Sequence, residues 1–322
     1  AGDRSGFSVS NAGDVNSDGF DDLIIGAYGA DPNGFGSGSS YVVFGKASGF
    51  DAAMALSSLD GSNGFRLDGA AAFDLSGASV SNAGDVNGDG FDDVIIGARY
   101  ADRNGEHYGP SYVVFGEAAP FDATLDLASL DGNNGFRVGA GDQASSSVSS
   151  AGDVNGDGFD DLIVGSNRYS DNSSSSHVVF GKVSGFSATL NLSSLDGSNG
   201  VRLDVEGSID SVSGAGDVND DGYDDLLIGA SHATPNGNFS GSSYVIFGSR
   251  DFGGGQLPVI SGTSSDDVLR GTSAAEIFEA GDGNDILIGR GGADVFHGGA
   301  GVDQIKVPDL SFDSIDGGTG TD

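Results

Sequence analysis

Short apolar runs separated by polar turns recur along the first 250 residues of the chain. The runs are rich in Val, Ile, Phe and Tyr, and the turns between them are rich in Gly, Asn, Asp and Ser. Runs of this length and composition predict β-strands. Helical periodicity is weak, and it allows a single turn around Asp51–Leu59 and its counterparts. The pattern therefore predicts an all-β protein.

The apolar runs group into a long repeat of four predicted strands. In the first repeat they are Gly6–Ser10, Asp22–Gly26, Tyr41–Gly45 and Gly64–Leu67. Four short antiparallel strands per repeat are typical of one blade of a β-propeller. The fourth repeat lacks an obvious fourth strand, and the candidate for it is Leu257–Ile260.

An acidic loop joins the first and second predicted strands of every repeat. Its pattern is Asp-x-Asn-x-Asp-Gly-x-Asp-Asp, starting at residues 14, 85, 153 and 217. Oxygen side chains thus stand at positions 1, 3, 5 and 9, with glycine at position 6, which is the spacing that Ca²⁺ requires. Solvated turns are the alternative, but four copies of one pattern favour calcium. The predicted ligands, with the carbonyl oxygen at position 7, are Asp14, Asn16, Asp18, Phe20 and Asp22; Asp85, Asn87, Asp89, Phe91 and Asp93; Asp153, Asn155, Asp157, Phe159 and Asp161; and Asp217, Asn219, Asp221, Tyr223 and Asp225.

We expect these four calcium sites to be structural. A loop that fills the coordination sphere with its own oxygen atoms leaves no open position for a substrate. The aspartates at position 8 are expected to be surface charges at the entry to the second strand. They are Asp21, Asp92, Asp160 and Asp224.

A shorter repeat begins after Gly248, beyond a glycine-rich stretch. Nine-residue blocks start at residues 262, 271, 280, 289 and 298, with an acidic residue at position 6 and an aliphatic residue or Phe at position 8. The pattern Gly-Gly-x-Gly-x-Asp-x-U-x, where U is a large apolar residue, predicts a parallel β-roll that binds calcium between its coils. The first two blocks lack the second glycine and one of them has Glu276 in place of Asp, so metal binding is best supported from Gly281 onward, and the predicted ligands here are Asp285, Asp294 and Asp303.

The two repeats divide the chain into domains. The blade region covers residues 1–250, with blades at about 1–69, 70–139, 140–205 and 206–260. Residues 251–261 form either a linker or the last blade strand, and residues 262–322 form a truncated β-roll. No signal-peptide pattern precedes the first repeat, and the nonapeptide motif restarts where the chain stops. We therefore expect a segment of a larger protein.

The composition adds an electrostatic constraint. The chain has 322 residues, no cysteine and a formal net charge of −35 at pH 7. Such acidity argues against nucleic acid and anionic membranes as partners, and no apolar stretch approaches the roughly 20 residues of a membrane helix. The aspartates predicted as loop ligands would repel one another without cations. The lack of cysteine excludes disulfides and is common in bacterial proteins that are secreted unfolded.

Catalytic motifs are absent from the sequence. The four histidines are scattered, and neither HExxH nor G-x-S-x-G occurs. We therefore expect that this chain is not an enzyme. The segments between the second and third strands vary most between repeats, so they are either a ligand-binding surface or tolerant insertions. They are Tyr28–Gly38, Arg99–Pro110, Asn167–Ser176 and Ser231–Gly241.

The long repeats resemble the FG-GAP repeats of integrin α-subunits and of bacterial secreted proteins. All four carry the Phe-Gly element, first at Phe44-Gly45, and three carry the Gly-Ala element, first at Gly26-Ala27. The proline that usually follows is replaced, in the first repeat by Tyr28. The resemblance implies a β-propeller whose calcium loops lie on the face opposite its ligand. Propellers of this family usually have more blades than four, so the resemblance also implies an open arc of a longer propeller, with a closed four-bladed ring as the alternative.

The nonapeptides resemble the RTX, or haemolysin-type, repeats of bacterial proteins exported by type I secretion. Together the two resemblances imply a segment of a large bacterial secreted or surface adhesin. The predicted function is a calcium-binding extracellular adhesion, binding or scaffold module that folds when it meets calcium outside the cell. Its expected partner is an extracellular protein or glycan. The alternative is the non-catalytic portion of a secreted RTX enzyme, such as a lipase, protease or epimerase, and a third possibility is a purely structural spacer.

Overall fold

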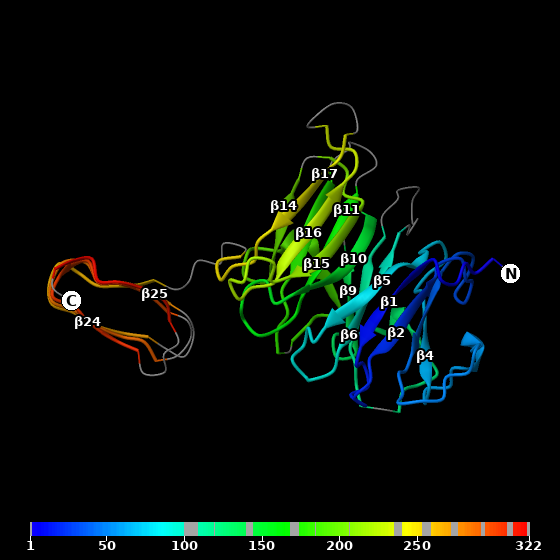
Figure 1. Cartoon of the computed structure of the whole chain (residues 1–322). Coiled ribbons are helices and arrows are strands. Elements are labelled where there is room, and N and C mark those ends of the chain that lie inside the picture. Colours follow the sequence, from blue (N-terminus) through cyan, green and yellow to red (C-terminus); the bar gives the residue numbers. More distant parts are fainter. Residues whose placement is uncertain are drawn as a thin grey trace. The chain divides into compact units, whose positions relative to one another are not determined.

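The structure is a computed structural model that describes residues 2–320, except for 100–108, 119, 140–143, 168–173, 184, 206, 235–239, 253–258, 272–275, 291–293 and 308–311. It divides into two compact units, Ala1–Gly253 and Gly254–Asp322 (Figure 1). Both are built from β-strands, and the described residues contain no α-helix. None of the helical turns in this part of the chain is long and apolar enough to cross a membrane. The all-β prediction is confirmed.

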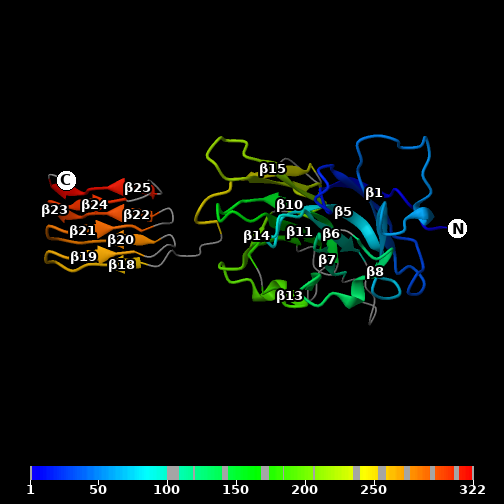
Figure 2. The same cartoon turned by 90° about the horizontal axis from the view of Figure 1, so that it is seen from below.

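The first unit contains four sheets, which correspond to the four predicted blades (Figures 1 and 2). In each sheet the strand before the acidic loop lies at one edge, and the following strands of the same blade are added beside it in chain order. Successive strands within a blade pair antiparallel. The strands are β1 (Ser8–Gly13), β2 (Asp22–Ala27), β3 (Ser39–Val43) and β4 (Gly64–Asp68); β5 (Ser76–Gly84), β6 (Asp93–Ala98), β7 (Ser111–Val114) and β9 (Gly135–Gly139); β10 (Ala144–Gly152), β11 (Asp161–Asn167), β12 (Ser174–Val179) and β14 (Gly200–Asp204); and β15 (Ser211–Gly216), β16 (Asp225–Ala230) and β17 (Ser242–Ile246).

The edge strands that precede the loops lie next to one another through the unit. β5 packs against β1, β10 against β5, and β15 against β10. One valine of β5, β10 and β15 packs into the core of the preceding blade. Val80 packs into the core of the first blade, Val148 into that of the second and Val212 into that of the third. This radial packing is that of a β-propeller. Among the described strands, β1 makes no comparable contact with β15, so the four blades form an open arc.

The first and second blades each also receive a short segment from the blade that follows. β8 (Thr124–Asp126) pairs in parallel with β4, and β13 (Thr189–Asn191) pairs in parallel with β9. Phe121, which precedes β8, stacks on Phe65 of the first blade with ring centroids 4.6 Å apart. Neighbouring blades therefore share a core along their whole depth.

A single 3₁₀ turn follows the third strand in each of the first three blades. The turns are η1 (Leu56–Ser58), η2 (Leu127–Ser129) and η3 (Leu192–Ser194). This is the single helical turn that the sequence allows around Asp51–Leu59.

The second unit is a parallel β-roll, as predicted. Two stacks of parallel strands alternate along the chain, so that strands 18 residues apart pair with one another, as Ile277 does with Val295. Its core contains the residues at position 8 of the nonapeptide, such as Leu269, Phe278 and Leu287. The strands are β18 (Val259–Ser261), β20 (Ile277–Glu279), β22 (Asp294–His297) and β25 (Phe312–Asp316) in one stack, β19 (Val268–Arg270), β21 (Ile286–Ile288) and β24 (Gln304–Lys306) in the other, and β23 (Ala300–Gly301) with β26 (Thr319–Gly320) at a turn.

The candidate fourth strand of the last blade lies elsewhere. Of Leu257–Ile260, the described residues Val259 and Ile260 belong to β18, which pairs in parallel with β20 of the roll. The reason is visible in the nonapeptide spacing, because Ile260 lies nine residues before Leu269 and contributes to the same core. In the described part of the chain, the fourth blade has three strands.

Candidate metal centres

The acidic loops fold around the carboxylate of their first residue. In the first loop, the Asp14 Oδ1 atom accepts the N–H of Asp18 and its Oδ2 atom accepts the N–H of Gly19, each at 2.9 Å. Gly19, at position 6, has φ +87°, and the glycines at this position in the other loops have φ between +88° and +91°. Only glycine takes this conformation at no steric cost. The sequence therefore fixes the turn that gathers the oxygen atoms.

The same bonds recur in all four loops. The N–H at position 5 bonds to the Oδ1 atom of position 1 at 3.0 Å in the second loop and at 3.1 Å in the third and fourth. The side-chain oxygen of the asparagine at position 3 accepts the same N–H, as Asn16 does from Asp18 at 2.9 Å. Positions 1, 3 and 5 thus converge on one turn.

The aspartate at position 9 is fully buried in every blade. The Asp22 Oδ1 atom accepts the N–H of Gly45 at 2.7 Å, and its Oδ2 atom accepts the N–H of Val15 at 3.1 Å. This carboxylate therefore ties the loop to the Phe-Gly turn after the third strand, which explains why the two motifs recur together. The equivalent aspartates, with the same two bonds, are Asp93, Asp161 and Asp225.

Burial makes the charge of this carboxylate unfavourable. Desolvation raises the pKa of Asp22 to about 6, and the nearby Asp18 and Asp14 add to the rise against the two backbone hydrogen bonds. Desolvation likewise raises the pKa of Asp161 to about 8 and that of Asp93 well above its ordinary value. A cation held by positions 1, 3 and 5 would offset this penalty.

The loop residues fit calcium by their chemistry. All the donors are oxygen atoms, and a carboxylate oxygen that accepts one N–H keeps a second lone pair for a metal. In the described part of the chain, however, no three acidic or histidine side chains stand close enough to hold an ion as they are placed.

Two of the residues at position 7, whose carbonyl oxygens are predicted ligands, also contact the preceding blade. The ring of Phe159 lies over Gly88, and the ring of Tyr223 lies over Gly156, each covering the loop of the blade before it. A side chain on either glycine would collide with the ring. The aromatic residue at position 7 is thus part of the junction between blades.

The prediction for the aspartates at position 8 is wrong for three of the four. Asp92, Asp160 and Asp224 are not free surface charges, because each accepts the backbone N–H of the first loop residue in the preceding blade. The bonds reach Asp14 at 2.7 Å, Asp85 at 2.9 Å and Asp153 at 2.9 Å. Asp21 has no preceding blade in the described chain, and it is exposed as predicted. Sequence reasoning missed these bonds because the partners are 71 to 78 residues apart in the chain.

The roll places its acidic residues in a ladder across the coils. The N–H of Asp285 donates to Asp303 Oδ1 at 2.8 Å, and the N–H of Asp267 donates to Asp285 Oδ1 at 2.7 Å. Asp285 is buried, and its Oδ2 atom has no hydrogen-bond partner among the described residues. A buried carboxylate oxygen without a donor is what a cation between coils would satisfy. The side chain of Asp294, the remaining predicted ligand, lies outside the described residues.

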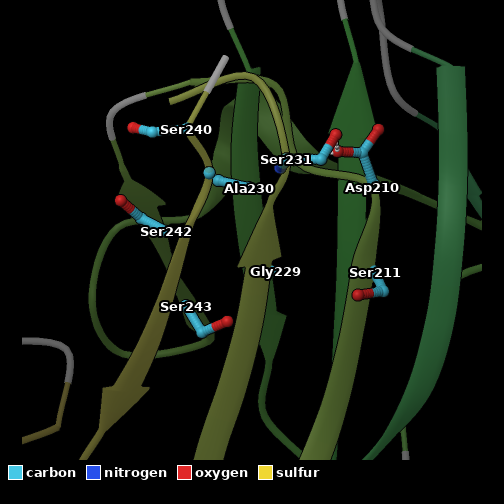
Figure 3. Close-up of a pocket in the computed structure, with 9 residues that line it drawn as sticks. Asp210, Ser211, Gly229, Ala230, Ser231, Ser240, Ser242 and Ser243 are labelled. Atoms are coloured by element: carbon cyan, nitrogen blue, oxygen red, sulfur yellow. Dashed lines mark hydrogen bonds between the residues drawn. The ribbon is translucent and has the colours of Figure 1, made fainter. Parts of the chain in front are cut away.

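The variable segments are only partly described. Tyr28–Gly38 is complete, whereas residues 100–108, 168–173 and 235–239 of the other three lie outside the described residues. The base of the fourth segment borders a polar pocket of about 410 Å³ (Figure 3). Asp210 lies on one wall, where it accepts the N–H of Ser231 at 2.9 Å, and serines of β17 form the opposite wall.

Comparison with known proteins identifies both repeats. The FG-GAP repeat model matches residues 5–43, 76–114, 145–179 and 210–246, and the model for the RTX calcium-binding nonapeptide repeat matches four copies within residues 270–305. Integrin alpha pat-2 of Caenorhabditis elegans is 31% identical over 193 residues, which cover 55% of this chain and 14% of that protein. Integrin alpha pat-2 of Caenorhabditis briggsae is 31% identical over 183 residues, or 52% of this chain and 13% of that protein. The matched region is thus about a seventh of the length of these relatives.

Proposed function

This chain is built from four FG-GAP repeats followed by RTX calcium-binding nonapeptide repeats, and we propose that it is an extracellular adhesion or scaffold module that calcium folds. The observation that carries the proposal is the position-9 aspartate, which is buried in every blade and in the first three blades is repelled by two other loop carboxylates. Such a carboxylate is unfavourable until a cation joins it. Calcium binding and blade formation are then a single event.

Secretion would supply the change in calcium that drives folding. The formal net charge of −35 keeps the chain expanded when the sites are empty, as they are at the submicromolar calcium of a cytoplasm. Outside the cell, millimolar calcium fills sites of modest affinity and stabilises the folded state by mass action. We propose type I secretion as the route, because RTX repeats accompany it.

The module would act by binding and not by catalysis. Loops over a repeated scaffold are where propellers commonly place their binding surfaces. We assign ligand binding to the variable segments between the second and third strands, with an extracellular protein or glycan as the partner. If the chain is instead the calcium-binding portion of a secreted RTX enzyme, its catalytic residues lie in another domain of the longer protein.

Isothermal titration calorimetry, which gives the number of calcium ions bound per chain, tests the assignment of the loops as calcium sites. Asp89→Ala removes one carboxylate from the second loop, and it should abolish binding of one ion while the other sites remain. Asp122→Ala is the matched control, because Asp122 is an exposed aspartate of the same blade outside the loop. Equal calcium numbers for the wild type and Asp89→Ala would contradict the assignment of that loop.

A glycan array and a cell-surface binding screen, each in calcium and in EDTA, test the binding role. We expect a ligand that is retained in calcium and released in EDTA. Empty screens in calcium would instead favour a structural spacer.

A further inference from the structure

Two of the four acidic loops place a glycine directly after the asparagine at position 3. These pairs are Asn87-Gly88 in the second blade and Asn155-Gly156 in the third, whereas Ser17 and Asp220 hold position 4 in the first and fourth. All four residues at position 4 are left-handed, with φ between +55° and +74°. The left-handed backbone therefore does not by itself require glycine at this position.

The packing between blades is what requires glycine in these two loops. A side chain on Gly88 would collide with the ring of Phe159, and one on Gly156 would collide with the ring of Tyr223. Each ring belongs to the blade that follows, so both contacts lie inside the blade series and do not depend on the ends of the chain. The packing that requires glycine thus places an Asn-Gly pair in a solvent-facing loop.

An Asn-Gly pair is chemically labile when its backbone can move. Asparagine is a thermolabile residue, and glycine has no side chain to shield the nitrogen that attacks it. The Gly88 nitrogen loses its proton to water and bonds to Cγ of Asn87, while the Cγ–Nδ2 bond breaks and the leaving nitrogen takes up a proton and departs as ammonia. Water then opens the succinimide ring at either carbonyl carbon. The product is an aspartate or an isoaspartate at position 87.

The second loop holds the reacting amide beside this nitrogen. Asn87 Oδ1 accepts the N–H of Asp89 at 2.9 Å, and Asn87 Nδ2 donates to Asp89 Oδ2 at 2.9 Å, so the side chain folds over Gly88. Asn87 is half-buried and Gly88 is exposed, so water reaches the pair. The N–H of Gly88 has no hydrogen-bond partner among the described residues. Nothing in the described loop therefore opposes loss of its proton.

The third loop restrains the attacking nitrogen. The N–H of Gly156 donates to Asp153 Oδ1 at 2.7 Å. This carboxylate stabilises the N–H and repels the anion that forms when the proton is lost. Of the two pairs, Asn87-Gly88 should therefore react faster.

Three other Asn-Gly pairs begin the fourth strands of the first three blades, and they are held differently. In each of them the asparagine Oδ1 atom accepts the N–H of the aspartate three residues earlier, at 3.1 Å, and the glycine is buried. The side chain is thus turned back toward the preceding turn, and the pair should be stable while its blade is folded. These pairs are Asn63-Gly64, Asn134-Gly135 and Asn199-Gly200.

We propose that Asn87 and Asn155 are sites of spontaneous deamidation and that calcium in their loops protects them. The proposal rests on the proposed function in one respect, the assignment of the loops as calcium sites. Because the Oδ1 atom at position 3 is a predicted ligand, a bound ion fixes the amide and holds the loop against the rearrangement that brings the nitrogen onto Cγ. Isoaspartate adds a backbone atom after position 3 and so destroys the ligand spacing. A loop left without calcium thus loses its site permanently.

Peptide mass spectrometry of the full chain, incubated in saturating calcium and mildly alkaline buffer, tests the proposal. Asp89→Ala empties the second loop alone, and Asn87 should then be converted at least about 10-fold faster than in the wild type, with Asn155 unchanged. Asp157→Ala empties the third loop and should give the reverse pattern. Asp18→Ala is the matched control, because it empties the first loop, where Ser17 follows Asn16. Asn16 should be converted at least about 10-fold more slowly in that variant than Asn87 is in Asp89→Ala.

Asn134 reports whether the second blade stays folded in Asp89→Ala. An intact Asn134 beside a converted Asn87 supports the proposal, because the lability then belongs to the loop. If both are converted, the substitution has unfolded the blade, and Asp85→Asn, which keeps the size of the side chain in the same loop, repeats the test. Equal rates for Asn87 in the wild type and in a folded variant would overturn the proposal. Calorimetry on that variant separates the two failures, because a lost ion leaves the calcium assignment standing.

Discussion

The carboxylate of Asp160 in the third blade accepts the backbone N–H of Asp85 in the second, with an Oδ2–N distance of 2.9 Å. The side chain of Asp85 is a predicted calcium ligand, so one residue connects the metal loop of its own blade to the neighbouring blade. The return bond runs from the N–H of Asp160 to the carbonyl oxygen of Asp85 at 3.3 Å. A loop that calcium orders is therefore also the docking surface of the next blade, and folding should propagate from blade to blade.

Removing this bond should destabilise the blade series. Asp160→Ala leaves the Asp85 N–H without its charged acceptor, and we expect a loss of about 1–3 kcal/mol in the free energy of unfolding. Urea denaturation in saturating calcium measures it. Asp21→Ala is the matched control, because Asp21 holds the same position in the first blade and is exposed there. The Asp21→Ala substitution should change the free energy of unfolding by less than about 0.5 kcal/mol. Equal losses for the two variants would contradict the role of the bond.

A pair of glycines separates the effect of blade contact from that of backbone strain. Gly152 has φ +71° and Gly216 has φ +66°, so alanine is strained at both positions to a similar extent. A side chain on Gly152 would collide with the Asp224 carboxylate, whereas one on Gly216 would meet no other atom. Gly152→Ala should therefore be less stable than Gly216→Ala by about 1–3 kcal/mol in thermal or urea unfolding. Equal stabilities would show that the contact with Asp224 is not tight.

His177 should make the third blade sensitive to acid. It is buried where the other blades have Tyr41, Tyr112 and Tyr244, and its Nδ1 atom has no hydrogen-bond partner among the described residues. Desolvation, and then the charge of Arg202, lower the pKa of His177 to about 4, against the opposing effect of Asp204. The folded state thus binds fewer protons than the unfolded state between pH 6.5 and about 4. This contribution to stability is complete above pH 6.5 and is lost as the pH falls toward 4.

His177→Tyr removes this titration and restores the residue type of the other blades. Relative to the wild type, the variant should gain about 2 kcal/mol of unfolding free energy between pH 7 and 4.5. Carboxylates that release calcium in acid are common to both proteins, so their effect cancels in the difference. A difference that does not change with pH would mean that His177 is solvated.

The acidic ladder of the roll should determine its calcium affinity. Asp285→Ala removes the buried carboxylate whose Oδ2 atom has no hydrogen-bond donor, and we expect the calcium concentration that orders the roll to rise about 10–100-fold. Asp282→Ala is the control, because Asp282 is an exposed aspartate of the same coil. Circular dichroism over a calcium titration measures both midpoints. Coincident midpoints would contradict the assignment of Asp285 as a ligand.

The sequence predicts what is local and repeated, and it misses what depends on neighbours. The strands around Leu23–Ile25 and the turn at Gly19 follow from patterns within one repeat, so they are predicted correctly. The role of Asp160 depends on a partner in another blade, and nothing within its own repeat distinguishes it from a solvated charge. The candidate blade strand that ends at Ile260 lies in the roll for a related reason. Its apolar run fits a blade strand as well as a roll strand, and only the spacing to Leu269 distinguishes the two.

Calcium-coupled folding is tested most directly by thermal unfolding of the full chain in millimolar calcium and then in EDTA, with the radius of gyration measured in both. We predict that calcium raises the unfolding midpoint by about 10 °C or more and that the chain is compact only with calcium. Magnesium at the same ionic strength is the control, because it does not favour such flexible loop sites and should give little of the effect. An unchanged midpoint and an unchanged radius in EDTA would contradict the coupling of calcium to the blades and the roll.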